Sequence, residues 1–88
     1  MMSGRELQVE IVSREGSLFS GRGSQVQVPV VDGGLGILPG RQPLLAQLAK
    51  GDVIITTAQG RESVAVDGGF ISVDSDFVTV VADHGTVA

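Results

Sequence analysis

The chain has 88 residues and a formal net charge of −4, with 6 Lys and Arg against 10 Asp and Glu. This length fits one small domain and leaves no room for two. The acidic balance argues against nucleic acid as a partner and against a polybasic membrane anchor, because both need a basic surface. The chain has no cysteine and one histidine. These counts exclude a disulfide framework, a cysteine nucleophile and a zinc site built from several Cys or His ligands.

The composition predicts an all-β domain. The 14 Val, 5 Ile and 4 Thr favour strands, and the 13 Gly supply turns. Residues 1–6 are expected to form an N-terminal tail, with no apolar run behind it that would indicate a signal peptide or a transmembrane helix.

Apolar residues alternate along most of the chain, and turn signals recur about every 8–12 residues, as in a β-sandwich or barrel. In chain order, we expect strands at 7–11, 18–19, 25–30, 53–57, 62–66, 70–73 and 77–82, with a short apolar piece at 37–38. The connections between them are expected at 14–17, 21–24, 32–36, 58–61, 67–69 and 74–76. Pro29 cannot donate to a ladder and predicts an edge or a strand end. The segment around Leu44, Leu45 and Leu48 fits a short helix ending before Gly51 as well as it fits a strand.

No motif for catalysis or cofactor binding emerges from the residues. The glycine-rich stretch 32–36 lacks the Lys and Ser/Thr of a P-loop, and its spacing does not match the dinucleotide fingerprint. The stretch 74–76 lacks the Gly and Glu that follow in a calcium loop. Ser13 and Glu15 have only His84 as a possible base, which falls short of a catalytic triad. We therefore expect no enzyme activity, no cofactor, no metal and no small-molecule ligand.

Two residues suggest other functions. Lys50 is the only lysine, and a lysine in a turn of a small β-domain could be a lipoyl or biotinyl attachment site. The flanking residues argue against that carrier function, but it stays the main alternative. Arg41 lies in a segment fixed by prolines and glycine, where a recognition residue can be presented at little entropic cost.

Four blocks of the sequence resemble the epsilon subunit of F-type ATP synthases. The longest is Gly-Gly-Leu-Gly-Ile-Leu-Pro-Gly-Arg-Gln-Pro-Leu-Leu at 33–45, where the family reads Gly-Glu-Leu-Gly-Ile-Leu-Pro-Gly-His-Ala-Pro-Leu-Leu. The other blocks are 9–21, 66–73 and 78–83. Their order and spacing agree with the family over nearly the whole chain.

The resemblance implies a β-sandwich, or flattened barrel, of about ten strands, the N-terminal domain of an epsilon subunit. It also implies that residues 44–45 form a strand. We expect the sandwich at 7–83 and a C-terminal tail, which includes His84, at 84–88. The implied function is that of a non-catalytic rotor subunit in the central stalk, which binds the gamma subunit and the c ring and couples proton transport to ATP synthesis. The implied location is peripheral, at the cytoplasmic face of the bacterial plasma membrane, without insertion into it.

Site residues follow from the resemblance position by position. Ser13, Arg41 and Gln42 match positions that face the gamma subunit. Asp32, Gly33, Gly34 and Leu35 match the loop that faces the c ring. Two positions depart from the family: Arg41 replaces a histidine, and Gly34 replaces a glutamate for which Asp32 is the possible substitute. The family's C-terminal helical hairpin, which inhibits ATP hydrolysis, has no counterpart in these residues, so we expect no helical inhibition.

Overall fold

The computed structural model describes residues 6–87 and forms eight strands there. They are β1 (Leu7–Ser13), β2 (Gly16–Gly23), β3 (Gln25–Val30), β4 (Gly33–Ile37), β5 (Leu44–Thr57), β6 (Gly60–Asp74), β7 (Phe77–Ala82) and β8 (Gly85–Val87). The expected all-β fold is confirmed. Residues 1–5 of the expected N-terminal tail lie outside the described residues.

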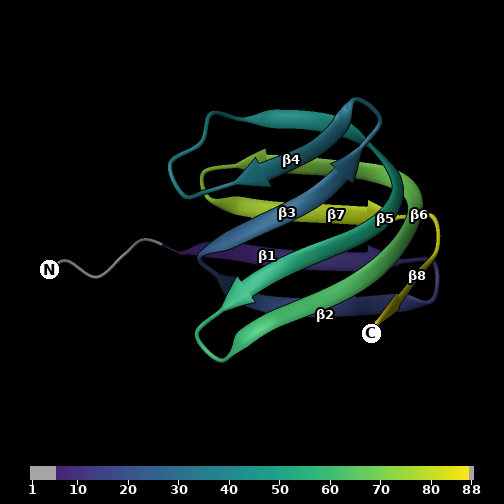
Figure 1. Cartoon of the computed structure of the whole chain (residues 1–88), viewed down its shortest axis with the longest axis horizontal. Helices are drawn as coiled ribbons and strands as arrows, with labels where there is room; N and C mark the ends of the chain where they lie inside the picture. Colours follow the sequence, from purple (N-terminus) through teal and green to yellow (C-terminus); the bar gives the residue numbers. More distant parts are fainter. Residues whose placement is uncertain (1–5, 88) are drawn as a thin grey trace, which may run out of the picture.

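The strands form one sheet that folds over on itself (Figure 1). Its order is β2-β1-β7-β6-β5-β3-β4, and β8 pairs with β6. The long strands β5 and β6 bend together and pass from one layer of the sandwich to the other (Figure 1). The first layer therefore contains β2, β1, β7, the C-terminal half of β6 and the N-terminal half of β5. The second layer contains the other halves of β5 and β6 with β3, β4 and β8.

The resemblance implied about ten strands. The eight observed strands agree with that number when β5 and β6 are counted once in each layer.

Sixteen apolar side chains, each at most 3% exposed, fill the space between the layers. Burying this apolar surface is the main favourable contribution to folding. The alternation expected for strands is clear in β1 and β7. These two strands pair in parallel, although they come from opposite ends of the sequence. Their inward residues are Leu7, Val9, Ile11, Val78, Val80 and Ala82.

At the bend, both long strands change which face they turn to the core. In β6, Val64 and Val66 point inward before the bend and Ile71 and Val73 after it, so the two-residue period shifts by one residue. Gly68 and Gly69 lie between them with φ values of +83° and +119°. These φ values favour glycine and let the strand turn the corner without a break.

Several expected connections are instead parts of strands. The turn expected at 67–69 is the bend inside β6, and the loop expected at 32–36 is mostly β4. Glycine usually indicates a turn in a sequence, but in both places it lies within a strand and does not end it. The break expected at 21–24 is reduced to Ser24, because β2 continues to Gly23.

Other expectations at this level are confirmed. The segment that begins at Leu44 is a strand, as the resemblance implied, and not a helix. Two-residue turns connect β5 to β6 at 58–59 and β6 to β7 at 75–76. Pro29 is the last residue but one of β3, which is an inner strand and not an edge strand. It lies where the pairing of β3 with β5 is interrupted, so its missing N–H costs no ladder bond there.

Candidate interaction surfaces

The described residues contain no buried polar or charged side chain. A catalytic centre depends on acids, bases or nucleophiles placed where burial or neighbouring charges tune them. Within residues 6–87 there is also no group of three acidic, His or Cys side chains that could hold a metal ion.

No helix in the described part of the chain could cross a membrane.

The outer face of the first layer is unusually apolar. Strand pairing places Leu45, Phe70 and Val81 on neighbouring strands β5, β6 and β7, and all three point away from the core. Their exposed fractions are 75%, 58% and 43%. Val12 continues the series on β1, where it pairs with Val81. We call these four residues the apolar face.

An outward sheet face that meets water is normally polar, as the alternating pattern of antiparallel sheets shows. The surroundings of the apolar face follow that rule. Its neighbours on the same side include Gln47, Ser72, Thr79 and Glu10, and the Glu10 carboxylate accepts a hydrogen bond of 2.7 Å from Ser20 Oγ. An apolar centre with a polar rim is the arrangement of a protein–protein interface.

Ser13 lies at the end of β1, directly after Val12 of the apolar face. Its hydroxyl donates to Glu15 Oε1 at 2.9 Å and accepts from the Glu15 amide at 3.2 Å. These bonds order the β1–β2 turn at this end of the sheet.

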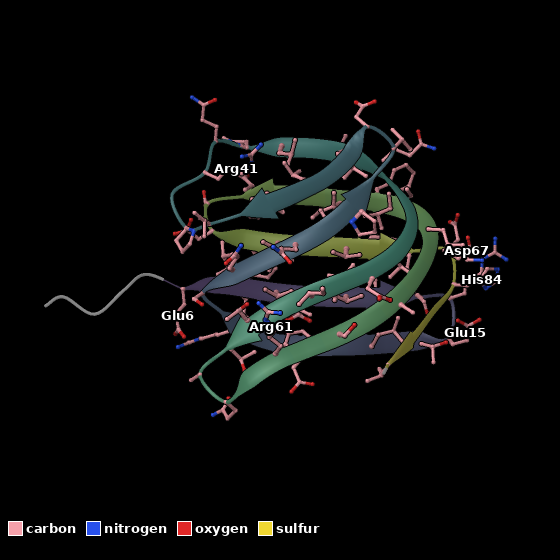
Figure 2. The ribbon with its side chains drawn as sticks, in the orientation of Figure 1. Glu6, Glu15, Arg41, Arg61, Asp67 and His84 are labelled. Carbon is pink, nitrogen blue, oxygen red and sulfur yellow. The ribbon has the colours of Figure 1, made fainter. Side chains whose placement is uncertain are left out.

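Arg41 and Gln42 lie at the opposite end, in the segment 38–43 between β4 and β5. Both side chains are exposed. The Gly40 amide of this segment donates to Asp76, whose carbonyl oxygen accepts from Gln8 near the start of β1. The strand from Gln8 to Ser13 covers roughly 16 Å at the usual rise per residue. Figure 2 shows Arg41 at one end of the strands and Glu15, next to the Ser13 turn, at the other.

The structure therefore does not bring Ser13 and Arg41 into one cluster. It puts them at the two ends of the same layer, with the apolar face between them.

Asp32, Gly33, Gly34 and Leu35 lie together at the β3–β4 connection. The turn consists of residues 31–32 only, because the other three residues belong to β4. The expected loop is thus the exposed start of an edge strand. Val31 of this turn donates to the carbonyl oxygen of Gln47 in β5 at 3.3 Å, which ties the turn to the first layer.

Lys50 does not lie in a turn. It is an exposed residue inside β5, paired with Asp67 of β6. Carrier modules present their lysine at a hairpin tip, so the geometry that this alternative needs is not found.

His84 was expected in a tail, but it lies at the start of a strand pairing. Its carbonyl oxygen accepts from the Asp67 amide at 2.9 Å, and β8 follows directly. The paired region therefore continues past 83 as far as Val87.

Sequence reasoning missed Leu45, Phe70 and Val81 as surface residues. A signal was present in the Phe70–Ile71 and Val80–Val81 pairs, because two adjacent apolar residues in a strand cannot both face the core. Which residue of each pair points outward depends on how the strands pair on the two sides of the bend. That pairing cannot be predicted from the sequence alone.

Proteins similar to this chain are found among the subunits of ATP synthases. The sequence profile of one family, described as the β-sandwich domain of the ATP synthase delta/epsilon chain, matches residues 6–87. The ATP synthase epsilon chain of Micrococcus luteus is 49% identical over 78 residues, which cover 88% of this chain and 86% of that protein. The epsilon chain of Rhodococcus opacus is 42% identical over 85 residues, covering 94% of this chain and 70% of that protein.

Solved structures support the same fold at low sequence identity. A chain of the mitochondrial ATP synthase of Euglena gracilis, in a structure of OSCP, F1 and c-ring, matches with a TM-score of 0.85 and 16% identity. That match covers 93% of this chain and 53% of the other. A chain from the central stalk and c-ring of the Tetrahymena thermophila enzyme matches with a TM-score of 0.72 and 12% identity, covering 97% of this chain and 69% of the other.

Proposed function

We propose that the chain binds the gamma subunit and the c ring in the central stalk. The reason is that the chain belongs to the ATP synthase delta/epsilon family through its β-sandwich domain. In the central stalk it helps to couple proton transport to ATP synthesis. The observation that carries the proposal is the family match over residues 6–87, together with epsilon chains that are 49% and 42% identical.

Epsilon chains are stalk subunits and do not themselves catalyse the reaction of the enzyme. The chain is therefore a non-catalytic component of an ATP synthase. A stalk component acts through its contacts, so its function depends on which surfaces meet which partners.

The gamma subunit is proposed to bind the first layer. The apolar face supports this assignment, because exposed Leu45, Phe70 and Val81 lose contact with water only when a partner covers them. Ser13 lies beyond one end of this face and Arg41 with Gln42 beyond the other. A single partner that covers the apolar face would reach all three residues, although Ser13 is far from the other two.

Arg41 is proposed to contact an acidic or carbonyl group of the gamma subunit. Its guanidinium is always charged and offers a planar fork of donors that fits a carboxylate, unlike the histidine usual in the family. The exposure of Arg41 supports this role, because the side chain is accessible from outside the domain.

The c ring is proposed to meet the β3–β4 turn and the start of β4. Asp32 carries the negative charge that the family has at position 34, and both Asp32 and Gly34 are exposed. A bound c ring would hold the domain at the membrane surface, peripherally and on the cytoplasmic face in a bacterium.

The test is recovery of ATP synthase subunits with the tagged chain from native membranes. We expect the wild-type chain to bring down gamma and the c ring. Arg41→Glu should reduce recovery of gamma by about tenfold, because a repulsive carboxylate would face the acidic partner group.

Arg61→Glu is the matched control. It makes the same charge change at an exposed residue of the second layer, where Arg61 pairs with Thr56 of β5 (Figure 2). Equal recovery of gamma with wild type and Arg41→Glu would remove Arg41 from the interface. Recovery of gamma without the c ring would contradict the c-ring contact.

A further inference from the structure

The segment 38–43 contains the proposed recognition residues Arg41 and Gln42, but it belongs to no strand. Its first half is a turn at Pro39–Gly40, with φ of +85° at Gly40. This is the φ that a type II turn requires at its third residue, and proline is favoured just before it. The turn fixes the direction of the chain immediately before Arg41.

The carboxylate of Asp76 ties this turn to another part of the domain. The Gly40 amide donates to Asp76 Oδ1 at 2.7 Å, a distance typical of a bond to an ionised acceptor. The two residues are 36 positions apart in the chain. The bond therefore fixes the segment against the β6–β7 turn, which is distant in sequence.

Asp76 is itself held in place through its backbone. It is the second residue of the two-residue β6–β7 turn, in which Ser75 and Asp76 have φ values of +52° and +64°. Positive φ at both central residues is typical of a type I′ hairpin turn, where Asn and Gly are the usual residues. The Asp76 carbonyl oxygen also accepts from the Gln8 amide at 2.9 Å, which anchors the turn to β1.

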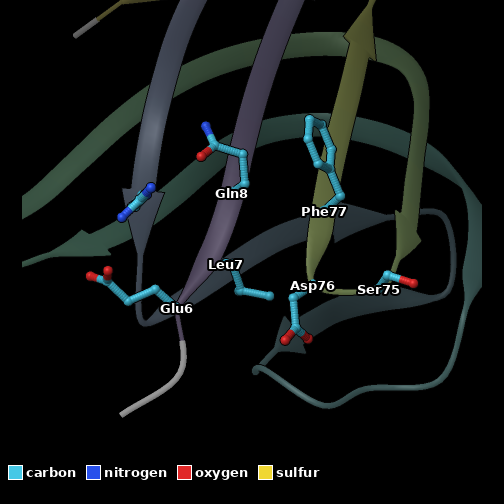
Figure 3. Close-up of a pocket in the computed structure, with 7 residues that line it drawn as sticks. Glu6, Leu7, Gln8, Ser75, Asp76 and Phe77 are labelled. Carbon is cyan, nitrogen blue, oxygen red and sulfur yellow. The ribbon is translucent and has the colours of Figure 1, made fainter. Parts of the chain in front are cut away.

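Asp76 thus occupies a left-handed conformation that glycine or asparagine would adopt more easily. Figure 3 shows Asp76 at the tip of the hairpin, among the residues that line a surface hollow together with Glu6, Leu7 and Phe77.

We propose that Asp76 is a positioning residue, which holds the 38–43 segment so that Arg41 and Gln42 are presented in the orientation that the partner recognises. This inference rests on the proposed function and adds to it the residue that organises the recognition segment. A segment that is ordered before binding loses less conformational entropy when the partner docks, so affinity rises without any contact between Asp76 and the partner.

The test uses two substitutions that keep the hairpin turn. Asp76→Gly keeps the positive φ and removes the acceptor, whereas Asp76→Asn keeps both the conformation and an acceptor oxygen. We expect faster amide exchange at Gly40 and lower backbone order parameters across 38–43 in Asp76→Gly. The isolated gamma subunit should bind this variant about three- to tenfold more weakly. Asp76→Asn should restore most of the order and of the affinity.

Asp74→Gly serves as a control in the same hairpin, because its carboxylate accepts from Ser75 Oγ and not from the 38–43 segment. It should leave the order of that segment unchanged. An unchanged Gly40 amide in Asp76→Gly would overturn the proposal, whatever the affinity. A loosened segment with wild-type affinity would overturn the positioning role. If Arg41→Glu were also without effect in that case, the failure would lie in the proposed interface itself.

Discussion

At Gly69 a side chain would have to occupy the space of the Val81 carbonyl oxygen in the neighbouring strand, and φ at this residue is +119°. Backbone cannot move aside as the end of a flexible side chain can. We expect Gly69→Ala to lower the free energy of unfolding by about 3 kcal/mol or more, from backbone strain and overpacking together. Chemical denaturation followed by circular dichroism measures this change.

Two other glycines separate the causes. A Cβ at Gly34 meets nothing within 4 Å, and its φ is not in the left-handed range, so Gly34→Ala should be neutral or stabilising by up to about 1 kcal/mol. Gly33 has open space but φ of +125°, so Gly33→Ala measures the cost of conformation alone. A loss in Gly69→Ala no larger than that in Gly33→Ala would contradict the clash with β7.

At the scale of single residues, the sequence allowed prediction where local chemistry is decisive. The turn at 75–76 follows from the short polar residues Ser75 and Asp76 between two apolar strands, and the turn at 58–59 from Gly60 directly after it, between two apolar runs. The bend at Gly68–Gly69 could not be predicted, because a pair of glycines fits a turn and a bend equally well. The choice depends on β7, which must pass close to Gly69 for the strand to continue.

At the scale of elements, substitutions at two neighbouring residues of β6 should separate binding from stability: one should weaken binding of gamma and the other should lower the free energy of unfolding. Phe70 is outward and Ile71 is fully buried. Phe70→Ala should change the free energy of unfolding by less than about 1 kcal/mol in the isolated domain, since the ring is already in water. It should weaken binding of gamma by about tenfold or more, because buried aromatic anchors dominate interface energetics.

Ile71→Val is the matched change on the inner face. It should cost about 0.5–1.5 kcal/mol of stability through the lost methylene and leave the affinity for gamma unchanged. Denaturation and titration calorimetry of the two variants measure both quantities. An affinity for gamma that falls with Ile71→Val and not with Phe70→Ala would move the interface away from the first layer.

The elements also show why the candidate surface was only partly predictable. Ser13, Arg41, Gln42 and the 32–35 stretch came from the resemblance, which works position by position along the chain. The apolar face is assembled from three long-range pairings, β5 with β6, β6 with β7 and β7 with β1. No periodicity along one strand specifies which strands become neighbours.

At the scale of the whole molecule, the topology predicts an uneven distribution of local stability. β7 lies between β1 and β6, so opening it breaks two ladders and exposes Val78, Val80 and Ala82. β4 is an edge strand that pairs with β3 and buries only Ile37 fully. Local opening costs least where few contacts are broken.

We therefore expect hydrogen-bonded amides of β7 to exchange only when the whole domain unfolds, and those of β4 to exchange at least about 100-fold faster by local opening. Hydrogen exchange by NMR at several low denaturant concentrations measures this difference. Equal rates and equal denaturant dependence in β4 and β7 would mean that the sandwich opens as one unit. With the expected gradient, the apolar face proposed for gamma includes Val81 of the stable strand β7, while the turn proposed for the c ring adjoins the less stable strand β4. The stalk contact would then be made by a rigid surface, and the contact toward the membrane by a segment that can adjust to its partner.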